Sequence, residues 1–100
     1  MNKVNIILNH GSLIISGELS RFTVEQLNDE AFSHWFSHSA IDVNLHDLSK
    51  VDTAGLAWLL YLLEQAKGFN CQLSFSHIPL QLEKQIILSG INGFFPTTNS

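Results

Sequence analysis

The chain is poor in charge and nearly free of cysteine. Charged residues make up 14% of its 100 residues, well below the roughly one quarter that is usual in globular proteins. Cys71 is the single cysteine, which excludes an internal disulfide and a metal site built from several thiolates. So little charge in a chain that is 45% hydrophobic predicts that a stable partner covers part of the apolar surface.

The net charge of −4 provides no electrostatic attraction for nucleic acid or for an anionic membrane surface. The apolar run that starts after Lys3 ends at Leu8, too early for a secretory signal. The longest apolar run, residues 54–63, is about half a membrane span. We therefore expect a cytoplasmic protein and interpret that run as a buried helix.

Motifs of catalysis are also missing from the sequence: it has no glycine-rich phosphate loop, no GxSxG turn and no paired-carboxylate motif. His34, His38 and Glu30 are spaced to share one helix face. A metal site needs three or four converging ligands, as a rule from more than one element, so we favour a solvated helix end. The sequence predicts no catalytic residue, no metal, no cofactor and no small-molecule substrate. The rival interpretation, a nucleotide-binding or nucleotide-hydrolysing domain, lacks both a phosphate loop and a lysine at a helix start.

Strand-like and helix-like segments alternate along the chain. Apolar residues alternate with polar ones over 4–8, and a second strand over 13–19 follows the turn signal at 9–12, which predicts a hairpin. Thr23-x-x-Gln26 is typical of a capping box and predicts a helix that continues to Phe36. The remaining predicted elements are a strand over 41–45, a helix over 56–63 that ends at Gly68, a strand over 71–75, and a helix from Pro79 to about Gly90.

This β-β-α-β-α-β-α order predicts a single α/β domain over residues 1–100. We expect a four- to five-stranded mixed sheet flanked by helices, in which an N-terminal hairpin precedes parallel strands. The polar tail, residues 96–100, is expected to fray. Ile91, Phe94 and Phe95 could either close the core or extend a surface patch, and the sequence does not decide between these two roles.

The segment from Leu48 to Leu56 joins the third predicted strand to the apolar helix. Asp52 or Thr53 is suited to cap that helix, because its side-chain oxygen can accept a hydrogen bond from a free backbone N–H. A helix N-terminus also favours a phosphate on Thr53, although the adjacent Asp52 carboxylate would repel it. Taken alone, the segment indicates a cap and a turn.

Two short motifs nevertheless resemble those of a known family. Val51-Asp52-Thr53-Ala54-Gly55-Leu56 resembles the D-[ST]-x-G-L signature of the STAS domain family, which includes sulfate transporters and anti-sigma factor antagonists. Gly17-Glu18-Leu19 resembles the family's G-E-L-D element. The resemblance covers nearly the whole chain. The form of the first motif and the short length are most similar to members that serve as cytoplasmic accessory subunits of phospholipid-transport ABC complexes.

The resemblance implies a STAS-like fold and a role in docking onto a partner protein. In the antagonists, the residue that matches Thr53 is phosphorylated by the partner kinase; in the accessory subunits it lies against the ATPase. Thr53 is therefore the expected interface residue and a possible phosphorylation site. Ser20 replaces the Asp that usually follows G-E-L, and Asn44 replaces an Asp of the third strand. Both replacements disfavour a phosphorylation switch and any role for nucleotide or Mg²⁺.

The apolar helix supplies a separate clue. At 100° per residue, Leu56, Leu59, Leu60 and Leu63 are expected to face the sheet, and the opposite side carries two aromatic residues. Trp and Tyr dominate binding hot spots, but a neighbouring helix of the same domain could also cover this side. The predicted partner-binding residues are Lys50, Asp52, Thr53, Ala54, Gly55, Trp58, Tyr61, Leu62 and Gln65.

Together these features predict a non-catalytic regulatory subunit that binds and stabilises the cytoplasmic ATPase of a phospholipid-transport ABC system. Such a subunit would be peripheral to the inner membrane only through its partner. The alternative is an anti-sigma factor antagonist that is switched by phosphorylation of Thr53 and whose partner is an anti-sigma kinase.

Overall fold

The computed structural model describes residues 2–91, 93 and 95–97, and it begins with the predicted hairpin. Strands β1 (Val4–Asn9) and β2 (Ser12–Leu19) pair in antiparallel fashion, with Asn9 opposite Ser12. The two residues between them, His10 and Gly11, have φ angles of 48° and 78°. Positive φ at both turn residues is the geometry that matches the twist of a tight hairpin.

Three further strands complete a five-stranded mixed sheet in which β1, β2, β3 (Ala40–Asn44) and β5 (Gln72–Ser76) are neighbours in that order. The parallel β2–β3 and β3–β5 pairs confirm the prediction of a hairpin followed by parallel strands. Strand β4 (Leu48–Val51) was expected to be a loop. It pairs in parallel with the second half of β2, beyond the point where β3 ends.

The helices differ more from expectation. The predicted long helix from Thr23 to Phe36 is replaced by a 3-10 turn, η1 (Val24–Gln26), and a single helical turn, α1 (Phe32–Trp35). The capping-box prediction is wrong because the Thr23 hydroxyl is used elsewhere: it accepts a hydrogen bond from Ser20 N at 3.0 Å and donates one to the Glu18 carbonyl at 2.9 Å. Helices α2 (Thr53–Gly68) and α3 (Leu80–Leu88) lie where they were predicted.

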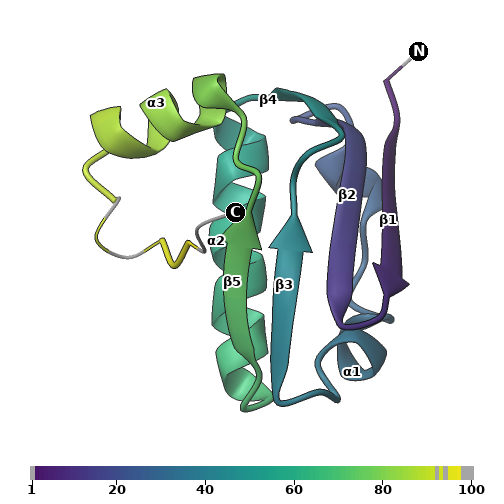
Figure 1. The fold of residues 1–100 in the computed structure, drawn as a ribbon. Helices are drawn as coiled ribbons and strands as arrows, with labels where there is room; N and C mark the ends of the chain where they lie inside the picture. The colour runs from purple at the N-terminus through teal and green to yellow at the C-terminus, as the bar shows by residue number, and fades with distance from the viewer. Residues whose placement is uncertain (1, 92, 94, 98–100) are drawn as a thin grey trace.

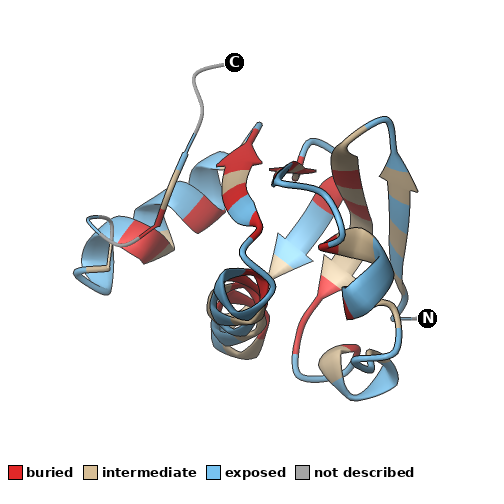
Figure 2. Cartoon of the chain, turned by 90° about the horizontal axis from the view of Figure 1, so that it is seen from below, coloured by how far each residue is buried: buried red, intermediate tan, exposed pale blue. Residues whose placement is uncertain are grey.

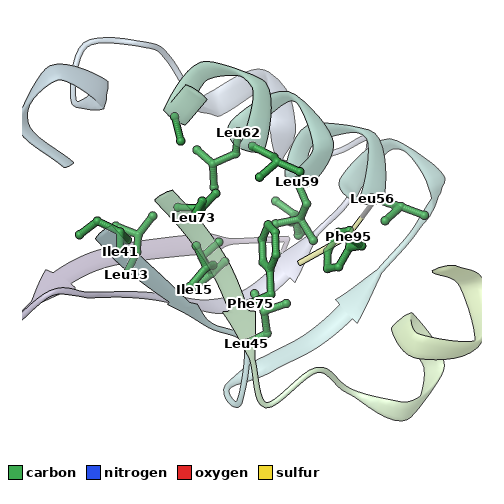
Figure 3. Close-up of a cluster of buried hydrophobic side chains, with 14 of the residues drawn as sticks. Leu13, Ile15, Ile41, Leu45, Leu56, Leu59, Leu62, Leu73, Phe75 and Phe95 are labelled. Atoms are coloured by element: carbon green, nitrogen blue, oxygen red, sulfur yellow. The ribbon is translucent and has the colours of Figure 1, made fainter. Parts of the chain in front are cut away.

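Helices α1 and α2 lie on the same face of the sheet, and α3 lies at the end of β5 near β4 (Figures 1 and 2). The core forms between α2 and the inward side chains of β2, β3 and β5 (Figure 3). These side chains alternate with more exposed, mostly polar ones on the opposite face. The fully buried members include Leu13, Ile15, Val43, Leu59, Leu62 and Phe75.

The end of the chain closes this core. Phe95 is buried and stacks on Phe75, with ring centroids 4.3 Å apart, which decides its role in favour of the core. Pro96 and Thr97 differ from the expected frayed tail, because the Phe75 N–H donates to the Pro96 carbonyl at 2.9 Å and Thr97 forms a bridge with Phe75. Phe94 and residues 98–100 lie outside the described residues. Within the described chain, no helix combines the length and hydropathy needed to cross a membrane.

Candidate functional site

Asp52 stands between β4 and α2 and holds the start of the helix. One of its carboxylate oxygens accepts a hydrogen bond from Gly55 N at 2.9 Å, which confirms the predicted cap. The other oxygen accepts from Arg21 N at 3.1 Å. A single carboxylate therefore ties the first turn of α2 to the segment that follows β2.

The ionised form of Asp52 is favoured at this position. Burial alone would raise the pKa of its carboxyl group and is the largest single influence. Hydrogen bonds from the backbone N–H groups of Arg21, Gly55 and Ala54, together with the Arg21 charge, outweigh it, so the pKa is lowered from its usual value of 3.8. Asp52 is therefore a charged structural cap at neutral pH.

Gly55 is buried and serves packing rather than partner contact. A Cβ on residue 55 would overlap the carbonyl oxygen of Leu19, at the end of β2. The Leu19 carbonyl also accepts a hydrogen bond from Asp52 N at 3.3 Å. The backbone that approaches Gly55 is thus the chain's own β2. A buried glycine in this position is not available to a partner, so Gly55 is not a docking residue.

The Gly17-Glu18-Leu19 motif has an equally local explanation. Gly17 has a φ of 88°, and a Cβ there would overlap the Lys3 carbonyl oxygen. The pairing register of β2 with β4 shifts between Gly17 and Glu18, a bulge that favours glycine. The bulge places Leu19 against α2, so the Gly17-Glu18-Leu19 motif packs directly against the second motif, at Gly55.

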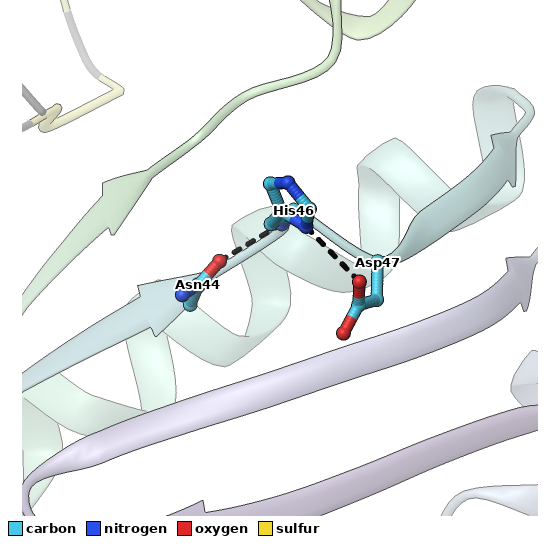
Figure 4. Close-up of polar contacts among 3 residues, drawn as sticks. All are labelled: Asn44, His46 and Asp47. Carbon is cyan, nitrogen blue, oxygen red and sulfur yellow. Dashed lines mark hydrogen bonds and ion pairs between the residues drawn. The ribbon is translucent and has the colours of Figure 1, made fainter.

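The two positions that lack the expected acids are occupied by local hydrogen bonds. The fully buried Ser20 donates from its hydroxyl to Glu18 Oε2 at 2.6 Å, and its own hydroxyl oxygen accepts a hydrogen bond from Phe22 N at 3.2 Å. Asn44 Oδ1 accepts from His46 N at 2.9 Å (Figure 4). Ser20 and Asn44 therefore shape turns at the carboxyl ends of β2 and β3.

Thr53, the first residue of α2, is exposed, and its hydroxyl makes no hydrogen bond with any described residue. It borders an open hollow of about 480 Å³. We call this feature the Thr53 hollow; it is lined by Arg21, Phe22, Lys50, Asp52, Thr53 and Ala54.

Arg21 and Phe22 were missed in the sequence analysis. Phe22 is 52% exposed, and the Arg21 guanidinium lies 4.8 Å from the centre of its ring. Arg21 and Lys50 both border the Thr53 hollow. They are two of the chain's five lysine and arginine residues, although the net charge of the chain is negative. The usable signal was an aromatic residue three positions after the G-E-L motif, in a turn that has no core side to bury it.

The predicted aromatic side of α2 is only partly free. Leu62 is fully buried, so its assignment to the docking face is wrong. Trp58 is half-buried and packs against the core. The Tyr61 hydroxyl donates to Asp29 Oδ2 at 2.8 Å, and the Tyr61 ring lies 6.0 Å from that of Phe32. The segment around α1 therefore covers part of this side, as the alternative interpretation allowed, and Tyr61 remains 40% exposed.

The half-buried Gln65 lies three turns from Thr53, roughly 18 Å along the helix. The helix places it well away from the Thr53 hollow. Of the predicted docking residues, the structure thus gathers four at one place: Lys50, Asp52, Thr53 and Ala54.

Apolar surface continues on α3, next to β4. The Gln85 side chain donates to the Val51 carbonyl at 3.0 Å and joins the two elements. Leu82 and Ile86 of α3 are buried, but its outer side exposes three large apolar side chains, Leu80, Ile87 and Leu88. Exposed apolar area of this kind is typical of a protein-interaction surface.

The histidines form no metal centre in the described part of the chain, where no three His, Cys, Asp or Glu side chains converge. His46 Nδ1 lies 3.0 Å from Asp47 Oδ1, in an exposed pair (Figure 4). The His77 ring packs edge-on to His46, with centroids 5.8 Å apart.

Comparison with known proteins agrees with this architecture. The family model described as "Mlab, STAS domain" matches residues 3–96. No curated protein sequence gives a significant match. An anti-sigma factor antagonist from Mycobacterium paratuberculosis superposes with a TM-score of 0.71 at 18% identity, covering 100% of this chain and 87% of that one.

Two further solved structures show the same fold. The phosphorylated form of the Bacillus cell fate determinant SpoIIAA has a TM-score of 0.64 at 17% identity, with 98% of this chain and 93% of that one covered. A STAS domain protein from Planctomyces limnophilus has a TM-score of 0.71 at 11% identity, with 97% and 90% covered. The chain thus belongs to the STAS domain family, and the model that matches it is the MlaB one.

Proposed function

We propose that this chain is a non-catalytic regulatory subunit of an Mla-type phospholipid-transport ABC system and that it binds and stabilises the cytoplasmic ATPase. STAS domains are protein-interaction modules, and the MlaB family model matches almost the whole chain. The observation that carries the proposal is Thr53. Its hydroxyl is exposed and makes no hydrogen bond with any described residue, and it lies at a helix start that Asp52 caps, beside an exposed aromatic ring.

The Thr53 hollow is suited to a protein partner. Phe22 offers a large apolar group that is more than half exposed, and aromatic side chains of this kind anchor interfaces. Arg21 and Lys50 offer positive charge at the margin, which favours acidic side chains on the partner. The exposed apolar side of α3 extends the same end of the molecule.

A direct binding measurement with the purified ATPase tests the proposal. We expect wild type and Thr53→Ser to bind equally, and Thr53→Glu to lose at least tenfold in affinity, because it adds charge and bulk at the contact. Ser33→Glu is the matched control, since Ser33 is exposed on α1 away from the Thr53 hollow. A wild-type chain that does not bind the ATPase would overturn the proposal.

An anti-sigma factor antagonist remains the second candidate. The solved structures with this fold support the two candidates equally, since one of them is an anti-sigma factor antagonist and another is a phosphorylated form. The exposed Thr53 hydroxyl is open to a kinase. Two replacements count against this candidate. Ser20 and Asn44 stand where the STAS family usually has Asp, and both form local hydrogen bonds.

Purification from native cells separates the two candidates. Co-purification of an ABC ATPase, with no phosphate on Thr53, supports the transport role. Co-purification of a serine/threonine kinase that phosphorylates wild type, but not Thr53→Ala, supports the antagonist role and overturns the first.

A further inference from the structure

Strand β1 forms one edge of the sheet, and no described residue pairs with its outer side (Figure 1). The Lys3 carbonyl accepts a hydrogen bond from Glu18 N at 2.8 Å, so odd-numbered residues direct their backbone groups towards β2. Successive residues of a strand direct these groups to opposite sides. The N–H and C=O groups of Val4, Ile6 and Leu8 therefore point outwards and are available to another strand.

This edge lacks the features that usually prevent strand addition. Natural edges carry lysine, proline or a bulge, or they are very short. β1 has six residues without charge or proline, and its pairing with β2 is unbroken from Val4 to Asn9. Ile7 is 52% exposed on the open face, while Ile6 and Leu8 are half-buried at the margin of the core. Another strand would cover apolar groups on both faces.

The sequence of β1 is complementary to itself. We propose that β1 pairs antiparallel with β1 of a second copy, so that the two sheets join into one. The two-fold axis of this pair passes midway between the two Ile7 residues. This register places Asn5 opposite Asn9 of the second copy and Ile7 opposite Ile7. On the core face it places Ile6 opposite Leu8 of the second copy.

The backbone groups fit the same register. Ile6 and Leu8 carry the outward N–H and C=O groups, so they form the hydrogen-bonded pairs, twice by symmetry. Ile7 then falls at a non-hydrogen-bonded pair, where opposing side chains are closest. A shift by one residue would set the exposed face against the core face. A two-fold centred on Ile6 keeps the faces but sets Asn5 against Ile7.

This pairing is independent of the proposed function. β4, which leads into Thr53, pairs with the side of β2 that faces away from β1. The contact between the two copies therefore lies across β2 from β4 and Thr53, so a failure of one proposal leaves the other standing.

Cysteine cross-linking of the purified chain tests the register. Opposing Cα atoms of a non-hydrogen-bonded pair lie about 4.5 Å apart, within the range that a disulfide accepts. We expect Ile7→Cys to form a disulfide-linked dimer under mild oxidation and Asn5→Cys alone to stay largely unlinked. A mixture of Asn5→Cys with Asn9→Cys should cross-link. The native Cys71 is buried, and burial raises the pKa of its thiol, so it does not compete.

Sedimentation over a range of concentrations tests the association itself. We expect a concentration-dependent dimer for wild type and at least a tenfold weaker one for Ile7→Lys, because the two-fold sets the new charges directly opposite each other. Ile87→Lys is the matched control: Ile87 is 56% exposed, close to the 52% of Ile7, but lies on α3. A monomer at all concentrations, a dimer that survives Ile7→Lys, or cross-linking without register preference would overturn the proposal.

Discussion

The carbonyl oxygen of Leu19 fills the space that a side chain on residue 55 would need. Leu19 ends β2 and Gly55 lies in the first turn of α2, so the contact joins the two motifs that carried the family resemblance. Asp52 N donates to the same carbonyl. The glycine of the second motif thus fixes how closely the functional helix start approaches the sheet.

Gly55→Ala should therefore destabilise the protein, although alanine is the better helix former. The added methyl group must displace backbone atoms of Leu19, and overpacking of this kind costs about 1–3 kcal/mol. Gly68→Ala is the control, because a Cβ there meets nothing within 4 Å. It should be neutral or stabilising by up to roughly 1 kcal/mol. Chemical denaturation of both variants gives the comparison, and equal stabilities would contradict the packing role of Gly55.

Asp52→Ala should cost about 0.5–2 kcal/mol, the usual loss for an N-cap, because Gly55 N and Arg21 N lose their acceptor. Urea denaturation at neutral pH measures the loss. Thr53→Ala is the comparison within the same turn and should leave stability nearly unchanged, since no described residue bonds the Thr53 hydroxyl. A stable Asp52→Ala variant would show that water replaces the cap without cost.

The same carboxylate makes stability depend on pH. Its folded pKa lies below the usual 3.8, so its stabilising effect is complete above that value and is lost as the pH falls through the folded pKa. The difference in unfolding free energy between wild type and Asp52→Asn should be constant above about pH 5 and shrink below pH 4. A difference that stays unchanged at low pH would contradict the charged cap.

Tyr61 is the only tyrosine, so its titration can be followed by phenolate absorbance alone. The hydrogen bond to Asp29 raises its pKa above 10, and partial burial and the Asp29 charge act in the same direction. Asp29→Ala should bring the pKa of Tyr61 back towards 10. Identical titration curves for wild type and Asp29→Ala would show that Tyr61 is not held by Asp29 in solution.

Much of the fold follows from the sequence because most strands alternate cleanly. The hairpin, β3, β5 and the cap of α2 were predicted at nearly their observed positions. β4 was missed because Leu48–Val51 is too short to show a period, and it pairs only where the bulge at Gly17 redirects β2. The long first helix was wrong because Thr23 bonds back to Ser20 and Glu18, a contact that spacing alone does not reveal.

The face of α2 was misjudged for a different reason. Leu59 to Leu63 are all apolar, so hydrophobic periodicity does not fix which of them point inwards. The small residues determine which side of α2 faces the sheet. Gly55 and Ala66 are buried where the helix approaches the sheet, and Leu62 lies on the same side and is therefore in the core. The predicted site was incomplete for a related reason: Phe22 lies in a turn, and helical periodicity gives no information about residues in turns.

These corrections change what is expected of Trp58. It was predicted to be a docking residue, but it is half-buried against the core. Trp58→Ala should therefore lower the unfolding free energy by roughly 2 kcal/mol, about half the loss of a fully buried tryptophan. Thermal or urea denaturation measures this directly. An unchanged denaturation midpoint would show that the Trp58 side chain lies on the surface and not in the core.

Phe22→Ala should show the opposite pattern. Its ring is more than half exposed, so its removal should change stability by no more than about 0.5 kcal/mol. Loss of an interface aromatic should instead weaken ATPase binding by about 2 kcal/mol, close to thirtyfold. Phe69→Ala is the control: Phe69 is 44% exposed beyond the far end of α2, away from the Thr53 hollow. Full binding by Phe22→Ala would show that the partner does not use this hollow, even if Thr53→Glu abolishes the complex.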